Sequence, residues 1–134
     1  MFWDRLTKAA AAALGAAAGL FGEWNILFTV LAWLMAIDYV TGLICACCGR
    51  SPKTEGGGVS SRAGFAGLAR KGLIMLVILT ATLLDRATNN NLFQTAAASY
   101  YIANEGISIL ENSALLGVPY PKRLRDALEA LREG

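Results

Sequence analysis

The strongest constraint on the fold is an apolar segment, residues 26–48, with the sequence ILFTVLAWLMAIDYVTGLICACC. A helix needs about 20 predominantly apolar residues to cross the hydrocarbon core of a bilayer. This segment exceeds that length, and Asp38 is its only charged residue. Trp24 precedes it, and tryptophan is enriched where membrane meets water. The segment therefore predicts a membrane-spanning helix near residues 25–48.

The composition of the whole chain agrees with a membrane protein. Only 16% of the 134 residues are charged, whereas soluble domains carry roughly 25%. The net charge of +2 is too small to indicate a nucleic-acid partner. The chain has no histidine, the commonest general base and metal ligand. No catalytic or phosphate-binding motif is present, so we expect one membrane domain over residues 1–134, no enzyme activity and no cofactor.

The N-terminal segment, residues 2–21, is rich in alanine and glycine. Its apolar run from residue 9 to residue 21 would be about 20 Å long as a helix, short of the roughly 30 Å hydrocarbon core. Three interpretations stay open: a helix that spans a thinned bilayer, a helix that lies at the interface, or the core of a signal peptide. Gly15 and Gly19 are spaced for close helix packing within a membrane.

A third apolar stretch, residues 63–84, carries Arg70 and Lys71 a third of the way in. Either the helix begins near Gly72, or it begins earlier and the two bases snorkel or form ion pairs. Asp38 lies at a similar depth in its own helix, so a pair between Asp38 and one of these bases is predicted. The alternative is that Asp38 bonds to hydroxyl groups and the bases snorkel separately.

The next helix, residues 92–116, is apolar on most sides and polar along one stripe. A carboxylate near the middle of such a helix is costly in hydrocarbon and faces protein or water. The stripe therefore lines either an aqueous lumen or a polar seam between helices. Residues at steps of three and four form this stripe: Tyr101, Asn104, Glu105, Ser108, Glu111 and Asn112.

The charges of the loops predict the topology. From residue 50 to residue 71 five bases oppose one acid, which places this glycine-rich loop in the cytoplasm. The turn at residues 22–25 and the loop at residues 85–91 have no basic excess and are expected outside. The tail at residues 121–133 predicts an amphipathic helix with four bases and three acids, also cytoplasmic. We thus expect an all-α integral membrane bundle with three or four transmembrane helices, the first helix deciding the number.

Three cysteines lie together in the sequence CACC at residues 45–48. A site built from thiolates alone is one interpretation, but the spacing matches no usual zinc pattern. The other interpretation is a set of small apolar residues near a helix end. We predict no metal site.

Several motifs resemble the phage lysis and toxin-secretion holin family. Asp38-Tyr39-Val40-Thr41-Gly42 resembles the family's aspartate-aromatic-x-threonine-glycine motif. Ser61, Gly64, Gly67-Leu68 and Arg70-Lys71 resemble its small-residue stretch that ends in a basic pair, and Leu84-Asp85 resembles its closing aspartate. The longest match is YYIANEGISILEN at residues 100–112, followed by LGVP at residues 116–119. The CACC cluster and the triple glycine fall outside this resemblance.

The resemblance implies a holin that accumulates in the bacterial inner membrane, forms homo-oligomers and opens lesions. An endolysin would be a functional partner with no required direct contact, and relatives in some bacteria would release toxins. The competing classes are an antiholin-like or auxiliary membrane regulator and a small ion- or proton-coupled transporter. The transporter has less support, because no inverted repeat is visible in the sequence.

Overall fold

The structure is a computed structural model that describes residues 1–22 and 24–134. The described chain is all-helical, as expected. The helices are α1 (Phe2–Phe21), α2 (Ile26–Cys47), α3 (Ser61–Thr88), α4 (Leu92–Leu115) and α5 (Lys122–Glu133), with a short 3-10 turn at Glu55–Gly57. The turn expected at residues 22–25 includes residue 23, which lies outside the described residues.

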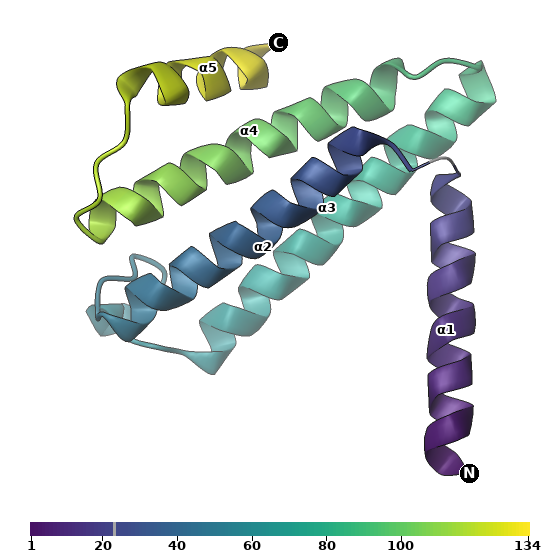
Figure 1. Cartoon of the computed structure of the whole chain (residues 1–134), viewed down its shortest axis with the longest axis horizontal. Helices are drawn as coiled ribbons and strands as arrows, with labels where there is room; N and C mark the ends of the chain where they lie inside the picture. Colours follow the sequence, from purple (N-terminus) through teal and green to yellow (C-terminus); the bar gives the residue numbers. More distant parts are fainter. Residues whose placement is uncertain (23) are drawn as a thin grey trace.

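Three long helices form the body of the molecule. In Figure 1, α2, α3 and α4 run beside one another, α5 folds back along α4, and α1 points away from the bundle. The apolar core lies between the three long helices, in the half away from the α2–α3 loop. It consists of Phe28, Leu31, Met35, Ile74, Ile78, Ala98 and Ile102. At the opposite end, Arg50 Nη1 donates to the Leu115 carbonyl at 3.0 Å, which ties the α2–α3 loop to the end of α4.

Helix α3 is longer than the predicted range at both ends. It begins directly after Ser60, whose hydroxyl accepts a hydrogen bond from Ala63 N at 3.3 Å, so Arg70 and Lys71 lie well inside it. It continues to Thr88, so Asp85 lies within α3 and does not end it. The side chain of Asp85 instead caps the N-terminus of α4. The Asp85 carboxylate, 1% exposed, accepts from Phe93 N at 2.9 Å and from Gln94 N at 2.7 Å. A carboxylate at a helix N-terminus satisfies free N–H groups and opposes the helix dipole.

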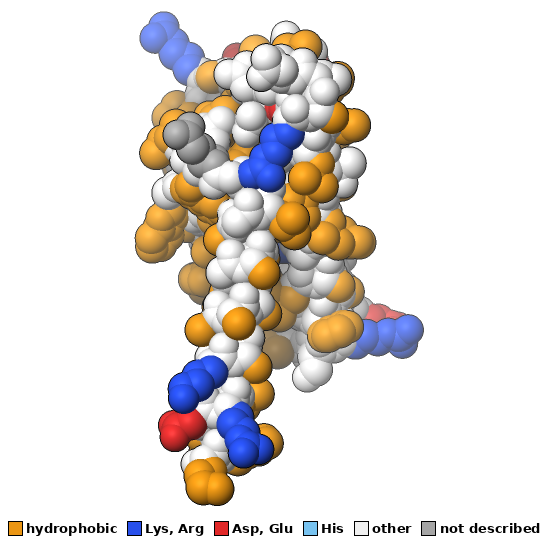
Figure 2. Space-filling model, turned by 90° about the vertical axis from the view of Figure 1, so that its right-hand side faces the viewer, with side chains coloured by type: hydrophobic (Ala, Val, Ile, Leu, Met, Phe, Trp, Pro, Cys, Tyr) orange, Lys and Arg blue, Asp and Glu red, His pale blue; other side chains and the backbone are white. Residues whose placement is uncertain are grey.

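Among the described residues, two helices have the length and composition to cross a membrane. The most apolar 18-residue windows of α2 and α3 have mean hydropathies of 1.9 and 1.7, yet only 22% of each window is buried. Large apolar side chains such as Trp33, Leu73 and Leu76 are more than half exposed. Figure 2 shows hydrophobic side chains spread over the face drawn, with Lys and Arg at separate points among them. Such extended exposed apolar surface is suited to lipid or to partner helices.

Helix α1 makes little contact with the rest of the described chain and has no buried residue. Arg86 Nη2 reaches the Gly19 carbonyl at 3.3 Å. A side chain built at Gly15 or Gly19 would meet nothing within 4 Å. The predicted packing of these two glycines therefore has no partner within the described chain and remains a prediction about other copies.

Candidate functional site

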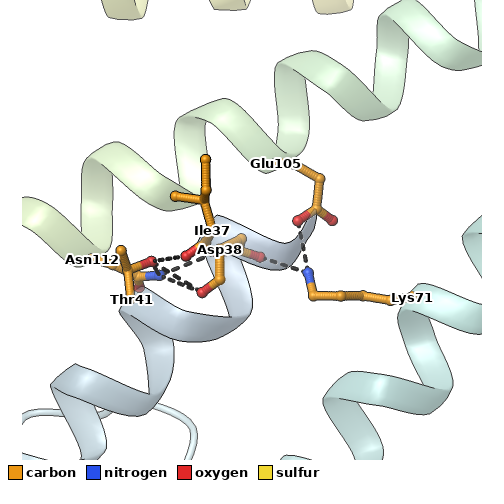
Figure 3. A network of polar contacts seen from close by, with 6 residues as sticks. All are labelled: Ile37, Asp38, Thr41, Lys71, Glu105 and Asn112. Carbon is orange, nitrogen blue, oxygen red and sulfur yellow. Dashed lines mark hydrogen bonds and ion pairs between the residues drawn. The ribbon is translucent and has the colours of Figure 1, made fainter. Parts of the chain in front are cut away.

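A buried charge cluster joins the three long helices. We define the charge cluster as Asp38 on α2, Lys71 on α3 and Glu105 on α4. Lys71 Nζ lies 2.9 Å from Asp38 Oδ2 and 2.7 Å from Glu105 Oε2, so one ammonium bridges two carboxylates (Figure 3). Asp38 is 5% exposed and Glu105 is 6% exposed. Bonds between ionised partners are stronger than neutral ones, so this cluster is a main polar connection between the helices.

Asn112 extends the charge cluster along the α2–α4 contact. Its Nδ2 donates to Asp38 Oδ1 at 3.1 Å, to Thr41 Oγ1 at 2.9 Å and to the Asp38 carbonyl at 3.3 Å. Thr41 Oγ1 in turn donates to the Ile37 carbonyl at 2.9 Å (Figure 3). Among the described residues, no buried side-chain nitrogen or oxygen is left without a partner.

Helix periodicity explains why these residues meet. Glu105 and Asn112 are seven residues apart, which places them two turns apart on one face of α4. Asp38 and Thr41 are three apart and share a face of α2 in the same way. Asp38 therefore lies between Lys71 on one side and Asn112 on the other, and both of its carboxylate oxygens have donors.

The charge cluster contains two carboxylates and one ammonium. With all three groups ionised it carries one net negative charge in the interior. Ionised groups held away from water are stable only when they are paired and hydrogen-bonded. Removal of Lys71 would leave two acids facing each other, so the lysine is the member whose loss should matter most.

A cavity of about 510 Å³ borders the charge cluster. It lies between α2 and α3 at the end near the connecting loop, with α4 forming its inner wall. Asp38, Lys71 and Glu105 all line it, together with Arg70 and Tyr39. The cavity thus extends from the buried charges to the α2–α3 loop, where Ser51, Lys53 and Thr54 also line it.

The predicted partner bases differ in their contacts. Lys71 contacts Asp38, whereas Arg70 is exposed and forms no ion pair among the described residues. The sequence left both bases as alternatives, and the structure places Lys71 at the acid because the two neighbours point in different directions from α3. Glu105 was predicted separately, as part of the stripe, and its contact with Lys71 was not foreseen.

The polar stripe of α4 divides between two sides. Glu105 and Asn112 face α2 and α3, and Tyr101 and Ser108 line the cavity between these helices. In the single chain this part of the stripe forms a polar seam.

The remaining stripe residues contact α5. Glu111 is exposed and its Oε1 lies 3.4 Å from Arg125 Nη2. Asn104 lines the cavity and also accepts from Arg132 Nη1 at 3.3 Å. The sequence predicts a single polar face, but the stripe is wide enough to contact two neighbouring parts of the chain. In the sequence, the feature that indicates this division is the amphipathic tail, because its basic side chains can bond to polar residues of the stripe.

The motif Asp38-Tyr39-Val40-Thr41-Gly42 has a structural explanation in these contacts. Asp38 belongs to the charge cluster and Thr41 accepts from Asn112. Tyr39 donates its hydroxyl to the Gly64 carbonyl at 3.4 Å, and a Cβ at Gly64 would lie 3.2 Å from that hydroxyl oxygen. The small residue on α3 therefore makes room for the tyrosine. Motif pieces from α2, α3 and α4 converge around one site.

The cysteines form no metal site in the part of the chain that the structure describes. Cys45 is buried, with its Sγ 3.4 Å from the Asn112 carbonyl, while Cys47 and Cys48 are exposed. No group of three or more candidate metal ligands occurs among the described residues.

The fold and the site together indicate a class: small proteins whose described residues form helices, with an apolar exterior suited to a membrane and charged groups bridged inside. Comparison with known proteins specifies the class further. The chain matches the bacteriophage holin family over residues 15–133 and belongs to that family.

Relatives come from bacteria and from a phage. A probable holin of Bacillus phage phi105 is 37% identical over 117 residues, covering 87% of this chain and 81% of the relative. An uncharacterized 14.9 kDa protein of Clostridium perfringens is 43% identical over 114 residues, covering 84% and 81%. An uncharacterized protein of Halalkalibacterium halodurans is 38% identical over 136 residues, covering 96% of each chain. No solved structure matches the chain.

Proposed function

We propose that this chain is a holin that oligomerises in the bacterial inner membrane and opens lesions through which an endolysin leaves the cytoplasm. The charge cluster is the observation that carries the proposal. Its two acids are buried, with the half-buried Lys71 between them, inside a bundle whose two most apolar helices are largely exposed. Charged groups within membrane segments are costly and accompany function. The proposal needs no catalysis, no cofactor and no direct contact with the endolysin.

The proposed topology has three or four crossings with a cytoplasmic C-terminus. The basic α2–α3 loop fits the cytoplasmic side. The contact between Arg50 and the Leu115 carbonyl supports a common side for this loop and the end of α4. Helix α5, which follows, would then lie on the cytoplasmic side of the membrane. Helix α1 decides between three and four crossings, and it is the helix least attached to the bundle.

In the proposed lesion, the polar groups of α4 have one of two roles. They either hold the helices of each subunit together or face the lumen after assembly. The contacts of Glu105 and Asn112 with α2 and α3 support the first role for these two residues. Small residues at Gly15 and Gly19 would then serve contacts between subunits.

Induced expression in a bacterium tests the proposal. Cells would express the chain with or without a separate cytoplasmic endolysin, while optical density and membrane potential are followed. We expect abrupt depolarisation in both cultures and lysis only when the endolysin is present. The Lys71→Met variant should delay or abolish depolarisation, and Arg70→Met is the matched control with the same loss of charge. Immunoblots of the membrane fraction would normalise the amounts.

Continued growth with an intact potential, at a membrane level equal to that of a known lytic holin, would overturn the proposal. An effect only on the timing of another holin would then identify a regulator. Uptake or efflux of a cation without a lesion would identify a transporter that uses the intramembrane acids. Release of a co-expressed large toxin in place of the endolysin would keep the lesion and change its cargo.

A further inference from the structure

Helix α5 lies on α4 as a short strap. A Cβ built at Gly106 would lie 2.9 Å from Leu128 Cδ1, so this glycine permits close approach of α5. Arg132 Nη1 donates to Asn104 Oδ1 at 3.3 Å, two residues before that glycine. Figure 1 shows α5 folded back along α4, joined to it by the segment of residues 116–121.

The strap covers an apolar face of α4. In a helical projection of α4, Ala103, Ile107 and Leu110 share one face. Asn104 and Gly106 lie at the two edges of this face. Glu105 and Asn112 are on the opposite side of the helix. Ala103, Ile107 and Leu110 are 0%, 5% and 8% exposed. Since α2 and α3 contact the opposite side, α5 accounts for this burial. We define the covered face as Ala103, Gly106, Ile107 and Leu110.

The polar attachment of the strap is weak. Helix α5 has no buried residue, and seven of its twelve residues are charged. Its ion pair with α4, between Arg125 and Glu111, is exposed, and exposed ion pairs contribute little to stability. The connecting segment contains Gly117 at φ 85° and two prolines, so it does not continue either helix. The core cluster contains no residue of α5, so the strap can leave α4 without disrupting the core.

A crossing of the membrane by α4 would force this separation, an argument that rests on the proposed function. Gly106 lies near the middle of α4, so an attached α5 would carry its charges to the middle of the bilayer. That position is very unfavourable for charged side chains. After separation, Asn104 loses Arg132 as its partner and the covered face meets lipid. Small residues with a polar side chain beside them favour helix association in membranes.

We propose that the covered face is the surface through which α4 of a second copy binds, and that α5 occupies it in the single chain. The Asn104 amide is both donor and acceptor, so two copies brought together here can bond to each other through the same residue. Release of the strap thus precedes assembly.

Disulfide trapping tests the proposed interface in vesicles of phosphatidylethanolamine and phosphatidylglycerol. All variants start from the full chain with Cys45, Cys47 and Cys48 replaced by alanine, after dye release from the vesicles shows that this background is active. Ala103→Cys then reports contact between two covered faces, because copper phenanthroline links the thiols into a dimer seen on a non-reducing gel.

Loosening the strap should increase this dimer. Arg125→Ala together with Arg132→Ala removes both side-chain hydrogen bonds from α5 to α4 and leaves the apolar contact at Leu128. We expect at least a threefold higher initial rate of dimer formation with Ala103→Cys. Lys122→Ala together with Arg123→Ala removes the same charge but no hydrogen bond to α4 among the described residues, and should leave the rate unchanged. Equal rates of dimer formation in the two double variants would contradict the proposal that α5 blocks the covered face.

Locking the strap should prevent assembly. Gly106→Cys with Leu128→Cys places two thiols across the α4–α5 contact, and oxidation in detergent before reconstitution would close it. The reduced form of the same variant is the baseline, because Gly106 belongs to the covered face. We expect the oxidised protein to remain monomeric on native gels and to release less dye than this reduced form. Equal assembly and release in the oxidised and reduced forms would refute the inference.

The readouts separate this inference from the proposed function. Dimers through Ala103→Cys without any dye release would support the interface and count against lesion formation. Dye release without dimers at Ala103→Cys would support lesions and overturn the interface.

Discussion

Lys71 gives the sharpest test of the charge cluster. Its ammonium contacts two carboxylates at 2.9 and 2.7 Å, and both acids are more than 90% buried. Breaking a buried ion pair by removing one partner costs about 3–5 kcal/mol, because the other charge is left unpaired. The Lys71 side chain is 15% exposed, so water reaches the site and the lower end of that range applies. A loss of about 3 kcal/mol corresponds to roughly a hundredfold change in the folding equilibrium.

The measurement is thermal unfolding of purified protein in detergent, followed by circular dichroism. For a chain of this length, about 3 kcal/mol corresponds to a midpoint lower by roughly 10 °C. Lys71→Met should show this decrease. Arg70→Met removes the same charge from the adjacent residue, which forms no ion pair among the described residues. That control should stay within about 0.5 kcal/mol of the unmodified chain.

Neutralising the acids should reverse the loss. In Lys71→Met with Glu105→Gln one buried carboxylate remains, and with Asp38→Asn as a third change none remains. Replacing buried ion pairs by neutral groups of similar volume is often nearly neutral for stability, so we expect stepwise recovery. The energies of the single variants would then be strongly non-additive. If Lys71→Met unfolds like Arg70→Met, or if the three losses simply add, the account of the charge cluster is wrong.

Two further predictions concern groups that join helices. Asn112→Ala removes three hydrogen bonds to α2, and should lower the midpoint of thermal unfolding more than Glu111→Ala, whose side chain is exposed; equal shifts would contradict the role of the amide. Asp85→Ala removes the cap of α4 and should cost about 0.5–2 kcal/mol. Amide exchange at Phe93 and Gln94 should become faster in Asp85→Ala while exchange in the middle of α4 is unchanged, and unchanged exchange at both amides would refute the cap.

Much of the helical architecture follows from the sequence because hydrophobic periodicity and helix-stopping residues are local signals. The all-helical fold and the apolar character of α2 and α3 could be predicted in this way. The ends of α3 could not, since Asp85-Arg86 looks like a loop until the carboxylate is seen at the start of α4. Charge alone does not tell whether an acid ends a helix or caps the next one.

The site was predictable in its members but not in its connections. Asp38, Lys71 and Glu105 each stand out as charges within apolar helices, and depth alone suggested that Asp38 reaches α3. Which base it reaches depends on the rotation of α3, and the bridge to Glu105 depends on how three helices pack together. The periodicity of polar residues predicts which face of a helix is polar. It does not predict which other helix that face contacts.

The division of the α4 stripe shows the same limit. Asn104 and Glu111 bond to α5, while Glu105 and Asn112 bond to α2 and α3. Residues that form one stripe in a single helix can therefore belong to two contacts in the molecule. The division becomes visible only once the fold-back of the tail is known.

During translation the members of the charge cluster are synthesised in the order Asp38, Lys71 and Glu105, that is, negative, positive, negative. If α2, α3 and α4 enter the bilayer in turn, Asp38 arrives without a partner, and Lys71 then neutralises it as α3 follows. A hairpin of α2 and α3 is thus the smallest of these pieces in which the buried charges compensate each other. Glu105 can only accept from a donor that is already in place, the Lys71 ammonium. The test is a translation assay with microsomes or inverted vesicles. We expect a nascent chain stopped after residue 91 to integrate stably into the membrane. The same chain with Lys71→Met should integrate less stably and return to the cytoplasmic side.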